Sequence, residues 1–160
     1  MPQIVIIYDS MSGNTEKMAK AVAEGATSVK GVVVELHKVG TRFPVSSLDK
    51  TDAIVLGSPT IYGNPTPDMR EFLSAVADLR KSGKLLLKNK IGGVFGSYGW
   101  DGGWVVDSLA ATMKTLAIKV IPPLVSAVDQ MGGMGVRISE DNLNKCRELG
   151  KAVAQKLVKP

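Results

Sequence analysis

Residues 8–15 read Tyr8-Asp9-Ser10-Met11-Ser12-Gly13-Asn14-Thr15 and stand between an apolar run, residues 4–7, and a segment with helical spacing that begins near Glu16. A strand, a short polar turn and a helix in this order place the turn at the N-terminus of the helix. There the amide donors are unpaired and the helix dipole is positive. The stretch therefore predicts an anion site. Because it contains no Lys or Arg, the predicted ligand is a terminal phosphate monoester bound by neutral donors.

The turn supplies both hydroxyl groups and backbone freedom. Three hydroxyls can donate to a phosphate, and Gly13 allows the backbone to come close to it. The pattern is neither the G-x-x-x-x-G-K-[ST] of nucleotide triphosphatases nor the G-x-G-x-x-G of dinucleotide folds. A helix cap with a glycine turn and no ligand is the alternative. The predicted phosphate loop consists of Ser10, Met11, Ser12, Gly13, Asn14 and Thr15.

Length and composition predict one soluble domain over residues 1–160. Apolar residues make up 44% and charged residues 22% of the chain, as in ordinary globular proteins. No apolar run is long enough for a membrane span, and the N-terminus has no signal-peptide pattern. One cysteine cannot form an intrachain disulfide, which favours the cytoplasm, and one histidine argues against a metal site. We therefore expect no membrane partner and no metal.

The formal charge of +5 raises the question of nucleic-acid binding. The densest basic stretch, residues 80–90, contains no aromatic residue that could stack on a base. We interpret this stretch as a solvated surface and expect no nucleic-acid partner.

Apolar runs alternate with segments of helical spacing along the whole chain. The predicted strands are residues 4–8, 32–39, 53–57, 91–96 and 120–125. The predicted helices centre on residues 18–26, 69–79, 109–117 and 143–157. Strict alternation of this kind predicts an α/β fold with a parallel sheet covered by helices on both faces.

The second strand carries Glu35 and His37 on one face, which a strand buried on both sides would not tolerate easily. An edge position for this strand is what the doubly wound order 2-1-3-4-5 provides. Residues 41–50, which contain Pro44, predict a connection with a short helix or none. In this order, ligands bind at the carboxyl ends of strands one and three, where the winding reverses.

Two further loops are expected at that end of the sheet. Residues 57–67 follow strand three and are rich in Pro and Gly, with Tyr62 at their centre. Residues 96–104 follow strand four and contain Tyr98, Trp100 and Trp104. Aromatic rings and glycine amides converging on one crevice suit a planar ring, and a planar ring joined to a phosphate describes flavin mononucleotide (FMN).

With these three motifs, the whole chain resembles a short-chain flavodoxin. The [ST]-x-[ST]-G-N-T pattern matches the first loop, while residues 57–60 and 95–100 resemble the flavodoxin domain of flavodiiron proteins. The resemblance implies that Ser58, Pro59, Thr60 and Tyr62 flank one side of the flavin ring. It implies that Ser97, Tyr98, Gly99 and Trp100 line the other side, with Gly102 and Gly103 shaping the loop. The predicted cofactor-binding set also includes Ile61, Gly63, Asn64 and Asp101.

The resemblance implies an electron-transfer protein that shuttles electrons between redox partner proteins, with FMN as its cofactor. Two alternatives stay open: an NAD(P)H-dependent quinone or flavin reductase of the same fold, and a non-redox binding module. No motif clearly supplies a nicotinamide site. The chain departs from many flavodoxins in being basic, and with one histidine it lacks a histidine-rich di-iron domain. The donor, the acceptor and the oligomeric state are not revealed by the sequence.

Single residues receive separate interpretations. Backbone near Gly63 is expected to hydrogen-bond flavin N5, and Asp101 is expected to disfavour an anionic reduced flavin. Cys146 is expected in the core, whereas Trp104 fits the core and a cofactor contact equally. Asp52 precedes strand three and therefore lies away from the crevice, which argues against a phosphoacceptor role.

Overall fold

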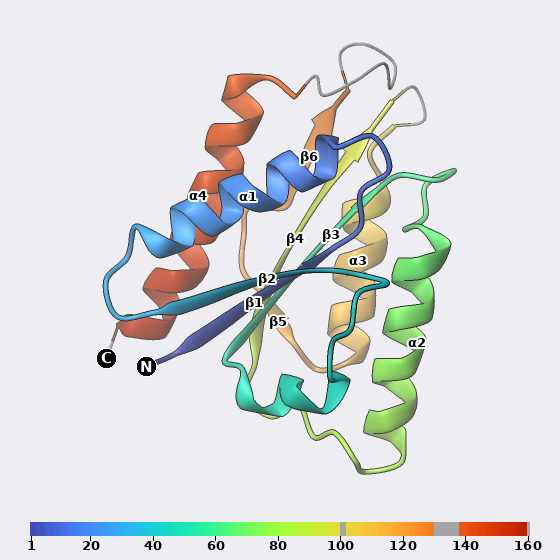
Figure 1. The fold of residues 1–160 in the computed structure, drawn as a ribbon, viewed down its shortest axis with the longest axis vertical. Coiled ribbons are helices and arrows are strands. Elements are labelled where there is room, and N and C mark those ends of the chain that lie inside the picture. The colour runs from blue at the N-terminus through green and yellow to red at the C-terminus, as the bar shows by residue number, and fades with distance from the viewer. Residues whose placement is uncertain (100–101, 130–137, 160) are drawn as a thin grey trace.

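The computed structural model describes residues 1–99, 102–129 and 138–159. In chain order the elements are β1 (Gln3–Tyr8), α1 (Asn14–Thr27), β2 (Val33–Lys38), the 3-10 helix η1 (Val45–Lys50), β3 (Ala53–Pro59), α2 (Pro67–Lys81), β4 (Ile91–Tyr98), α3 (Val105–Thr115), β5 (Lys119–Val120), β6 (Val125–Val128) and α4 (Glu140–Val158). Figure 1 shows these elements wound around a twisted sheet.

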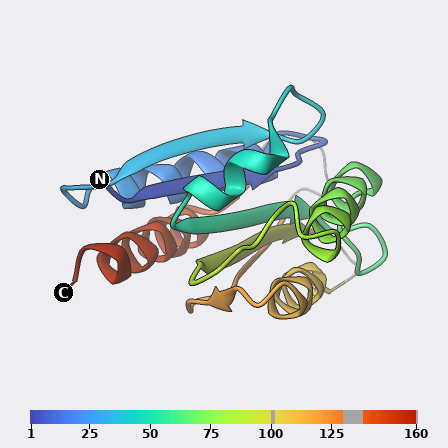
Figure 2. The same cartoon turned by 90° about the horizontal axis from the view of Figure 1, so that it is seen from below.

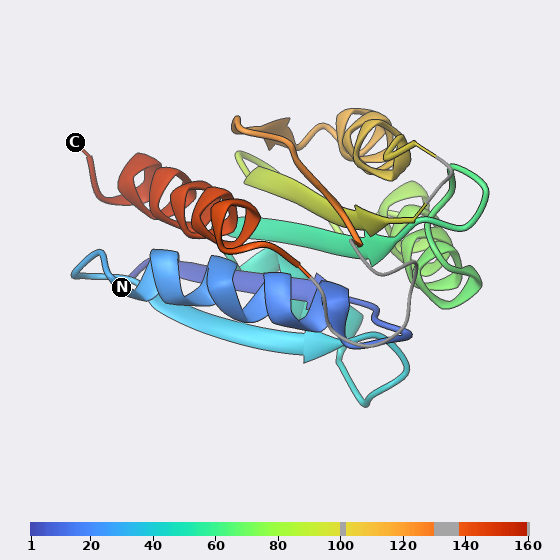
Figure 3. The same cartoon turned by 90° about the horizontal axis from the view of Figure 1, so that it is seen from above.

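The sheet is parallel and has the order β2-β1-β3-β4-β5, with β6 also paired to β4. The predicted order 2-1-3-4-5 is thus confirmed. The fifth strand, however, was predicted as one run over residues 120–125, and this was wrong. Pro122 and Pro123 interrupt it, because proline has no N–H to donate to the ladder. Two short strands, β5 and β6, therefore share the fifth position (Figure 3).

The edge position of β2 is confirmed. Glu35 points to solvent and His37 is partly exposed, and the two side chains lie 3.2 Å apart. The connection to β3 contains only η1, as the sequence predicts for residues 41–50. An edge strand with one polar face leaves its outer ladder groups to water, which is the usual arrangement for such strands.

Helices cover both faces of the sheet. One apolar cluster joins α1 and α4 to the strands, and a second joins α2 and α3 to the opposite face. Figures 2 and 3 show these two helix pairs with the sheet between them. The alternation of side chains along β1 explains the division: Ile4 and Ile6 enter the first cluster, whereas Val5 and Ile7 enter the second.

The two helices of the first layer touch backbone to backbone. A Cβ added to Gly25 of α1 would lie 1.9 Å from the carbonyl oxygen of Arg147. A Cβ added to Gly150 of α4 would lie 1.9 Å from the carbonyl oxygen of Val22. Only glycine fits at both positions, so this contact fixes α1 relative to α4.

Cys146 lies in this same layer with none of its surface exposed, which confirms the core position predicted for it. Burial raises the pKa of its thiol to about 12, although the nearby Arg147 acts in the opposite direction. The thiol therefore stays protonated at neutral pH. Among the helices of the described residues, none is both long and apolar enough to cross a membrane.

Candidate functional site

The loops that follow β1, β3 and β4 meet at the carboxyl edge of the sheet. The parallel register places Tyr8 beside Gly57, and Ser58 beside Gly96. The three strands therefore end at the same edge of the sheet. Doubly wound sheets bind their ligands at this edge. The three loops identified in the sequence are therefore brought together.

The first loop directs its amides onto a single oxygen. Ser10 Oγ accepts hydrogen bonds from the amides of Gly13 at 3.1 Å and Glu16 at 3.2 Å. Gly13 has φ 96°, a conformation that favours glycine, and it immediately precedes α1. Helix α1 begins at Asn14, two residues earlier than the sequence spacing indicated. The amides of Gly13 and Glu16 are engaged by Ser10 Oγ, which leaves the hydroxyl proton of Ser10 for an oxygen-rich ligand at the N-terminus of α1.

Thr15 joins the first loop to the third. It is buried, and its Oγ1 lies 2.8 Å from Ser97 Oγ, with either hydroxyl able to donate. Met11, by contrast, is 73% exposed, and Ser12 is exposed as well. The predicted phosphate loop therefore divides into a buried part that is attached to β4 and a tip that faces solvent.

Asp9 joins the first loop to the second. Its buried carboxylate accepts a hydrogen bond from the Thr66 hydroxyl at 2.5 Å and another from the Ser10 amide at 2.8 Å. Thr66 is also the N-cap of α2, because its Oγ1 accepts from the Met69 amide. These two residues were not in the predicted site. The position of Thr66 before Pro67 marks it in the sequence as a helix cap. No sequence signal indicates its contact with Asp9, which lies 57 residues away.

The second loop contains a tight turn over residues 61–64. Backbone hydrogen bonds link Ile61 and Asn64 in both directions, at 2.8 and 3.0 Å. Tyr62 and Gly63 have φ of 50° and 82°, which is the sign pattern of a type I′ turn. Tyr62 is 80% exposed, so its ring lies outside the core.

The second loop is also attached to β4. The Thr60 amide and the Thr60 hydroxyl both donate to the Ser97 carbonyl, each at 2.9 Å. Ser58 is fully buried, and its Oγ accepts from the Thr66 amide at 3.1 Å. Pro59, between them, is half-buried at the end of β3. Ser58 and Thr60 therefore hold the loop in place, and their hydroxyls are occupied within the protein.

The third loop begins with the buried Ser97 and continues through Tyr98 and Gly99. Gly102 and Gly103 have φ of 93° and 94°, which agrees with their predicted role in shaping the loop. The predicted contacts of Trp100 and Asp101 lie outside the described residues.

Trp104 follows these glycines as the N-cap of α3 and is 64% exposed, which excludes a core position. Its ring would lie 3.7 Å from a Cβ on Gly63 and 3.0 Å from a Cβ on Gly102. Trp104 thus contacts the second and third loops, although it was not in the predicted site. An aromatic residue directly after a Gly-Gly pair was the signal available in the sequence.

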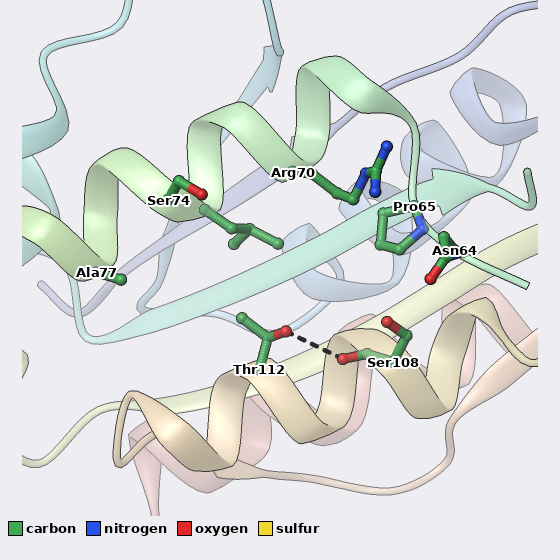
Figure 4. A pocket seen from close by; sticks show the side chains of 8 residues that line it. Asn64, Pro65, Arg70, Ser74, Ala77, Ser108 and Thr112 are labelled. Atoms are coloured by element: carbon green, nitrogen blue, oxygen red, sulfur yellow. Dashed lines mark hydrogen bonds between the residues drawn. The ribbon is translucent and has the colours of Figure 1, made fainter.

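A groove of about 320 Å³ between α2 and α3 borders the second loop at Asn64 and Pro65 (Figure 4). Ser108 and Thr112 line it from α3, and the Thr112 hydroxyl donates to the Ser108 carbonyl at 3.1 Å. Arg70 lies at the end nearest the loop. The groove is separate from the phosphate loop and is lined mainly by small side chains.

Among the described residues of the crevice, Asp9 and Glu16 carry carboxylates. Glu16 accepts a hydrogen bond from the Tyr8 hydroxyl at 3.2 Å. Burial of Tyr8 raises the pKa of its hydroxyl above the usual 10.0, and the Glu16 carboxylate adds to the shift. The described residues contain no cluster of His, Cys, Asp and Glu suited to a metal ion. The donors at the crevice are hydroxyl and amide groups, a set that suits a phosphate ester without a metal.

A doubly wound sheet with a hydroxyl-rich turn before α1 and two glycine-rich loops beside it defines a flavodoxin-like protein. Residues 6–150 match the family model described as "Flavodoxin", and the chain belongs to the flavodoxin family.

The chain is 33% identical over 154 residues to an uncharacterized protein of Methanocaldococcus jannaschii, covering 94% of this chain and 35% of that protein. The chain thus spans about a third of the length of this curated relative.

Solved structures of similar fold include stand-alone flavodoxins and a longer protein. A flavodoxin from the domain Archaea has 28% identity and a TM-score of 0.78, with 98% of this chain and 99% of that chain covered. Flavodoxin 1 of Bacillus cereus has 25% identity and a TM-score of 0.78, with 96% and 97% covered. Rubredoxin:oxygen oxidoreductase of Desulfovibrio gigas has 25% identity and a TM-score of 0.77, with 97% and 36% covered.

Proposed function

We propose that this protein binds FMN at the carboxyl edge of its sheet and transfers electrons between redox partner proteins. The observation that carries the proposal is the first loop, whose amides converge on one oxygen and whose Thr15 is attached to the third loop. Membership of the flavodoxin family supports the same cofactor. One cysteine, buried and protonated, suits the reducing cytoplasm as the place of action.

The donor set fits a phosphate monoester. Ser10 Oγ accepts two amides, so its own proton remains available for donation to a phosphate oxygen. Thr15 can donate to the phosphate if Ser97 donates to Thr15, and the distance between their hydroxyls permits either direction. Ser12 lies exposed at the tip and would supply the third hydroxyl. These three hydroxyls and the amides of the first turn of α1 would hold the phosphate.

The ring of the cofactor would lie between the second and third loops. Tyr62, Tyr98 and Trp104 are described aromatic residues of these loops, and they offer rings on which a flat ring can stack. The peptide between Tyr62 and Gly63 is the proposed partner of the ring's polar edge, because Gly63 allows this peptide to turn with little strain. When bound, FMN supplies the one- and two-electron chemistry, and the protein sets its energetics.

The decisive experiment adds FMN to the purified protein, removes free flavin by desalting and measures the visible spectrum. Retention of about one flavin per chain, absorbing near about 450 nm, is expected. Loss of all flavin would contradict the proposal and favour a non-redox binding module. The same preparation distinguishes a carrier from an enzyme: rapid NAD(P)H oxidation with a quinone would indicate a reductase instead.

A further inference from the structure

The turns at the amino edge of the sheet, opposite the candidate site, gather positive charge. These turns are residues 28–32, 45–52, 80–90, 114–119 and 156–159, and together they are called the basic edge below. They contain eleven of the 20 Lys and Arg residues of the chain but only two acidic residues, Asp49 and Asp52. The formal charge of the basic edge is therefore +9, whereas the whole chain carries +5.

Most of these charges form no ion pair with other described residues. The ion pairs among the described residues involve only His37 and Arg147, neither of which belongs to the basic edge. One basic group, the Lys90 ammonium, donates to the Asp49 carbonyl at 2.7 Å. Most of the other basic side chains of this edge are exposed. A surplus of unpaired cations on one end of a molecule attracts an anionic partner.

Backbone hydrogen bonds join several of these turns into one surface. The Asp52 amide donates to Gln3, the Ile91 amide donates to Asp52, and the Lys119 amide donates to Lys90. Figure 1 shows η1 and the α2–β4 connection together at the lower end of the molecule, and Figure 2 views that end from below. The positive charge of residues 45–52, 80–90 and 114–119 is thus gathered on one surface.

An apolar side chain is exposed within residues 80–90 of the basic edge. Leu86 is 55% exposed, although its neighbours Leu85 and Leu87 are buried. The Asp49 carboxylate fixes this arrangement, because it accepts hydrogen bonds from the amides of Leu86 at 2.9 Å and Leu87 at 2.8 Å. Lys84 and Lys88 flank the three leucines and are exposed. The fold therefore holds one leucine outward between two cations.

We propose that the basic edge binds the surface of a membrane rich in anionic lipids, with Leu86 entering the interfacial region. Lysines near such a surface are attracted to its headgroups, and a leucine gains from leaving water. Nucleic acid is less suited, because the basic edge has no aromatic residue on which bases could stack. An acidic protein would need a matching pocket for the exposed Leu86 side chain, whereas a lipid surface accepts it at any position.

This contact is peripheral, and it changes the interpretation of residues 80–90 as a merely solvated surface. The parallel strands run from the basic edge to the three loops, so a molecule docked by the basic edge turns its candidate site away from the membrane. The proposal does not depend on FMN.

Vesicle co-sedimentation tests whether the basic edge binds anionic membranes. The full chain is mixed with vesicles of phosphatidylcholine alone or with about 30 mol% phosphatidylserine, at about 50 mM and about 500 mM NaCl. We expect binding only to the anionic vesicles, and loss of that binding at high salt. The double variant Lys84→Glu/Lys88→Glu should weaken the partition by roughly tenfold or more, and Leu86→Ser by about threefold.

The matched control is Lys145→Glu/Lys151→Glu, which makes the same charge change at exposed positions of α4 outside the basic edge. It should alter binding by less than about twofold. Circular dichroism confirms that each variant is folded. The proposal is overturned if the anionic vesicles do not sediment the protein at low salt, or if the control variant weakens binding as much as the Lys84/Lys88 variant. Binding to duplex DNA is measured with the same variants. The proposal is also overturned if Lys84→Glu/Lys88→Glu weakens DNA binding and vesicle binding equally while Leu86→Ser changes neither.

Discussion

The two edges of the sheet differ in the side chains that they carry and in the hydrogen bonds that hold them. At the carboxyl edge, three loops are joined by buried side-chain hydrogen bonds, Thr15 to Ser97 and Thr66 to Asp9. At the amino edge, the turns carry eleven cations and are held mainly by backbone contacts, together with Asp49. The carboxyl edge keeps its polar groups in fixed positions, whereas most basic side chains of the amino edge are exposed to solvent.

The difference follows from how the chain enters and leaves each strand. Turns of the amino edge connect helices to strands and need only short, soluble links, so lysine is tolerated there. Loops of the carboxyl edge precede helix N-termini, where hydroxyls and glycines satisfy amide donors and where ligands bind. Substitutions of the same type at both edges should therefore have unequal effects.

The largest effect is expected from Thr15→Val, compared with Thr27→Val at the other end of α1. Thr15 pairs with buried Ser97, whereas the exposed Thr27 hydroxyl donates to the Ala23 carbonyl of its own helix. Loss of the Thr15 hydroxyl leaves Ser97 without its partner and removes a phosphate donor, so FMN affinity should fall about 100-fold. Fluorescence titration of FMN measures this. Equal affinities for the two variants would contradict the predicted phosphate role.

Asp9→Asn should lower the free energy of unfolding by about 1–3 kcal/mol, because the buried carboxylate accepts from both Thr66 and Ser10. Asp52→Asn is the control at the amino edge, where an exposed carboxylate accepts from the Gln3 amide at 2.8 Å. Its cost should stay below about 1 kcal/mol. Urea unfolding of both variants provides the comparison, which fails if Asp52→Asn is the more damaging change.

Asp49 offers a pH test of the amino edge. Burial acts to raise the pKa of its carboxyl, but hydrogen bonds from Leu86 and Leu87 and the nearby Lys90 lower it below the usual 3.8. A depressed pKa adds stability at neutral pH that is lost as the pH falls through the native pKa. Wild type should therefore lose more stability than Asp49→Asn when the pH falls below about 4. Unfolding at a series of acidic pH values checks this, and parallel curves would argue against it.

The smallest effect is expected from Tyr8→Phe at the carboxyl edge. The raised pKa of Tyr8 favours its protonated form in the native state, so its contribution is present below the usual pKa of 10.0 and is lost as the pH rises through the native value. Near neutral pH the variant should differ by less than about 1 kcal/mol. The stability difference should shrink in strong alkali, measured by chemical unfolding. A gap that widens with pH would reverse this interpretation.

Much of the fold could be predicted from patterns in the sequence, and the physical reasons can be given for particular strands. The polar face of β2, marked by Glu35 and His37, indicated an edge position for that strand, which agrees with the doubly wound order of the sheet. The fifth strand was wrong because an apolar run that contains Pro122 and Pro123 reads as a strand until the missing amides are counted. Apolar periodicity predicts burial but not the continuity of a hydrogen-bond ladder.

The candidate site was predicted as three loops, but the bonds between the loops were not. Thr15 appeared as a ligand donor, and its partner Ser97 lies 82 residues further along the chain. Asp9 and Thr66 likewise meet only once the register of β1 and β3 is set. A motif shows which groups a loop offers, whereas long-range contacts decide which of those groups are already engaged.

The glycine pair between α1 and α4 has a consequence for mutational tolerance. Helix α1 spans 14 residues, or about 21 Å, between the phosphate loop and the basic edge. Any side chain at Gly25 or Gly150 would push the two backbones apart. A displacement of α1 would also move the loop at its N-terminus. In a library of random variants selected for cofactor retention, both glycines should be as strongly depleted of substitutions as the phosphate loop, although neither belongs to the site.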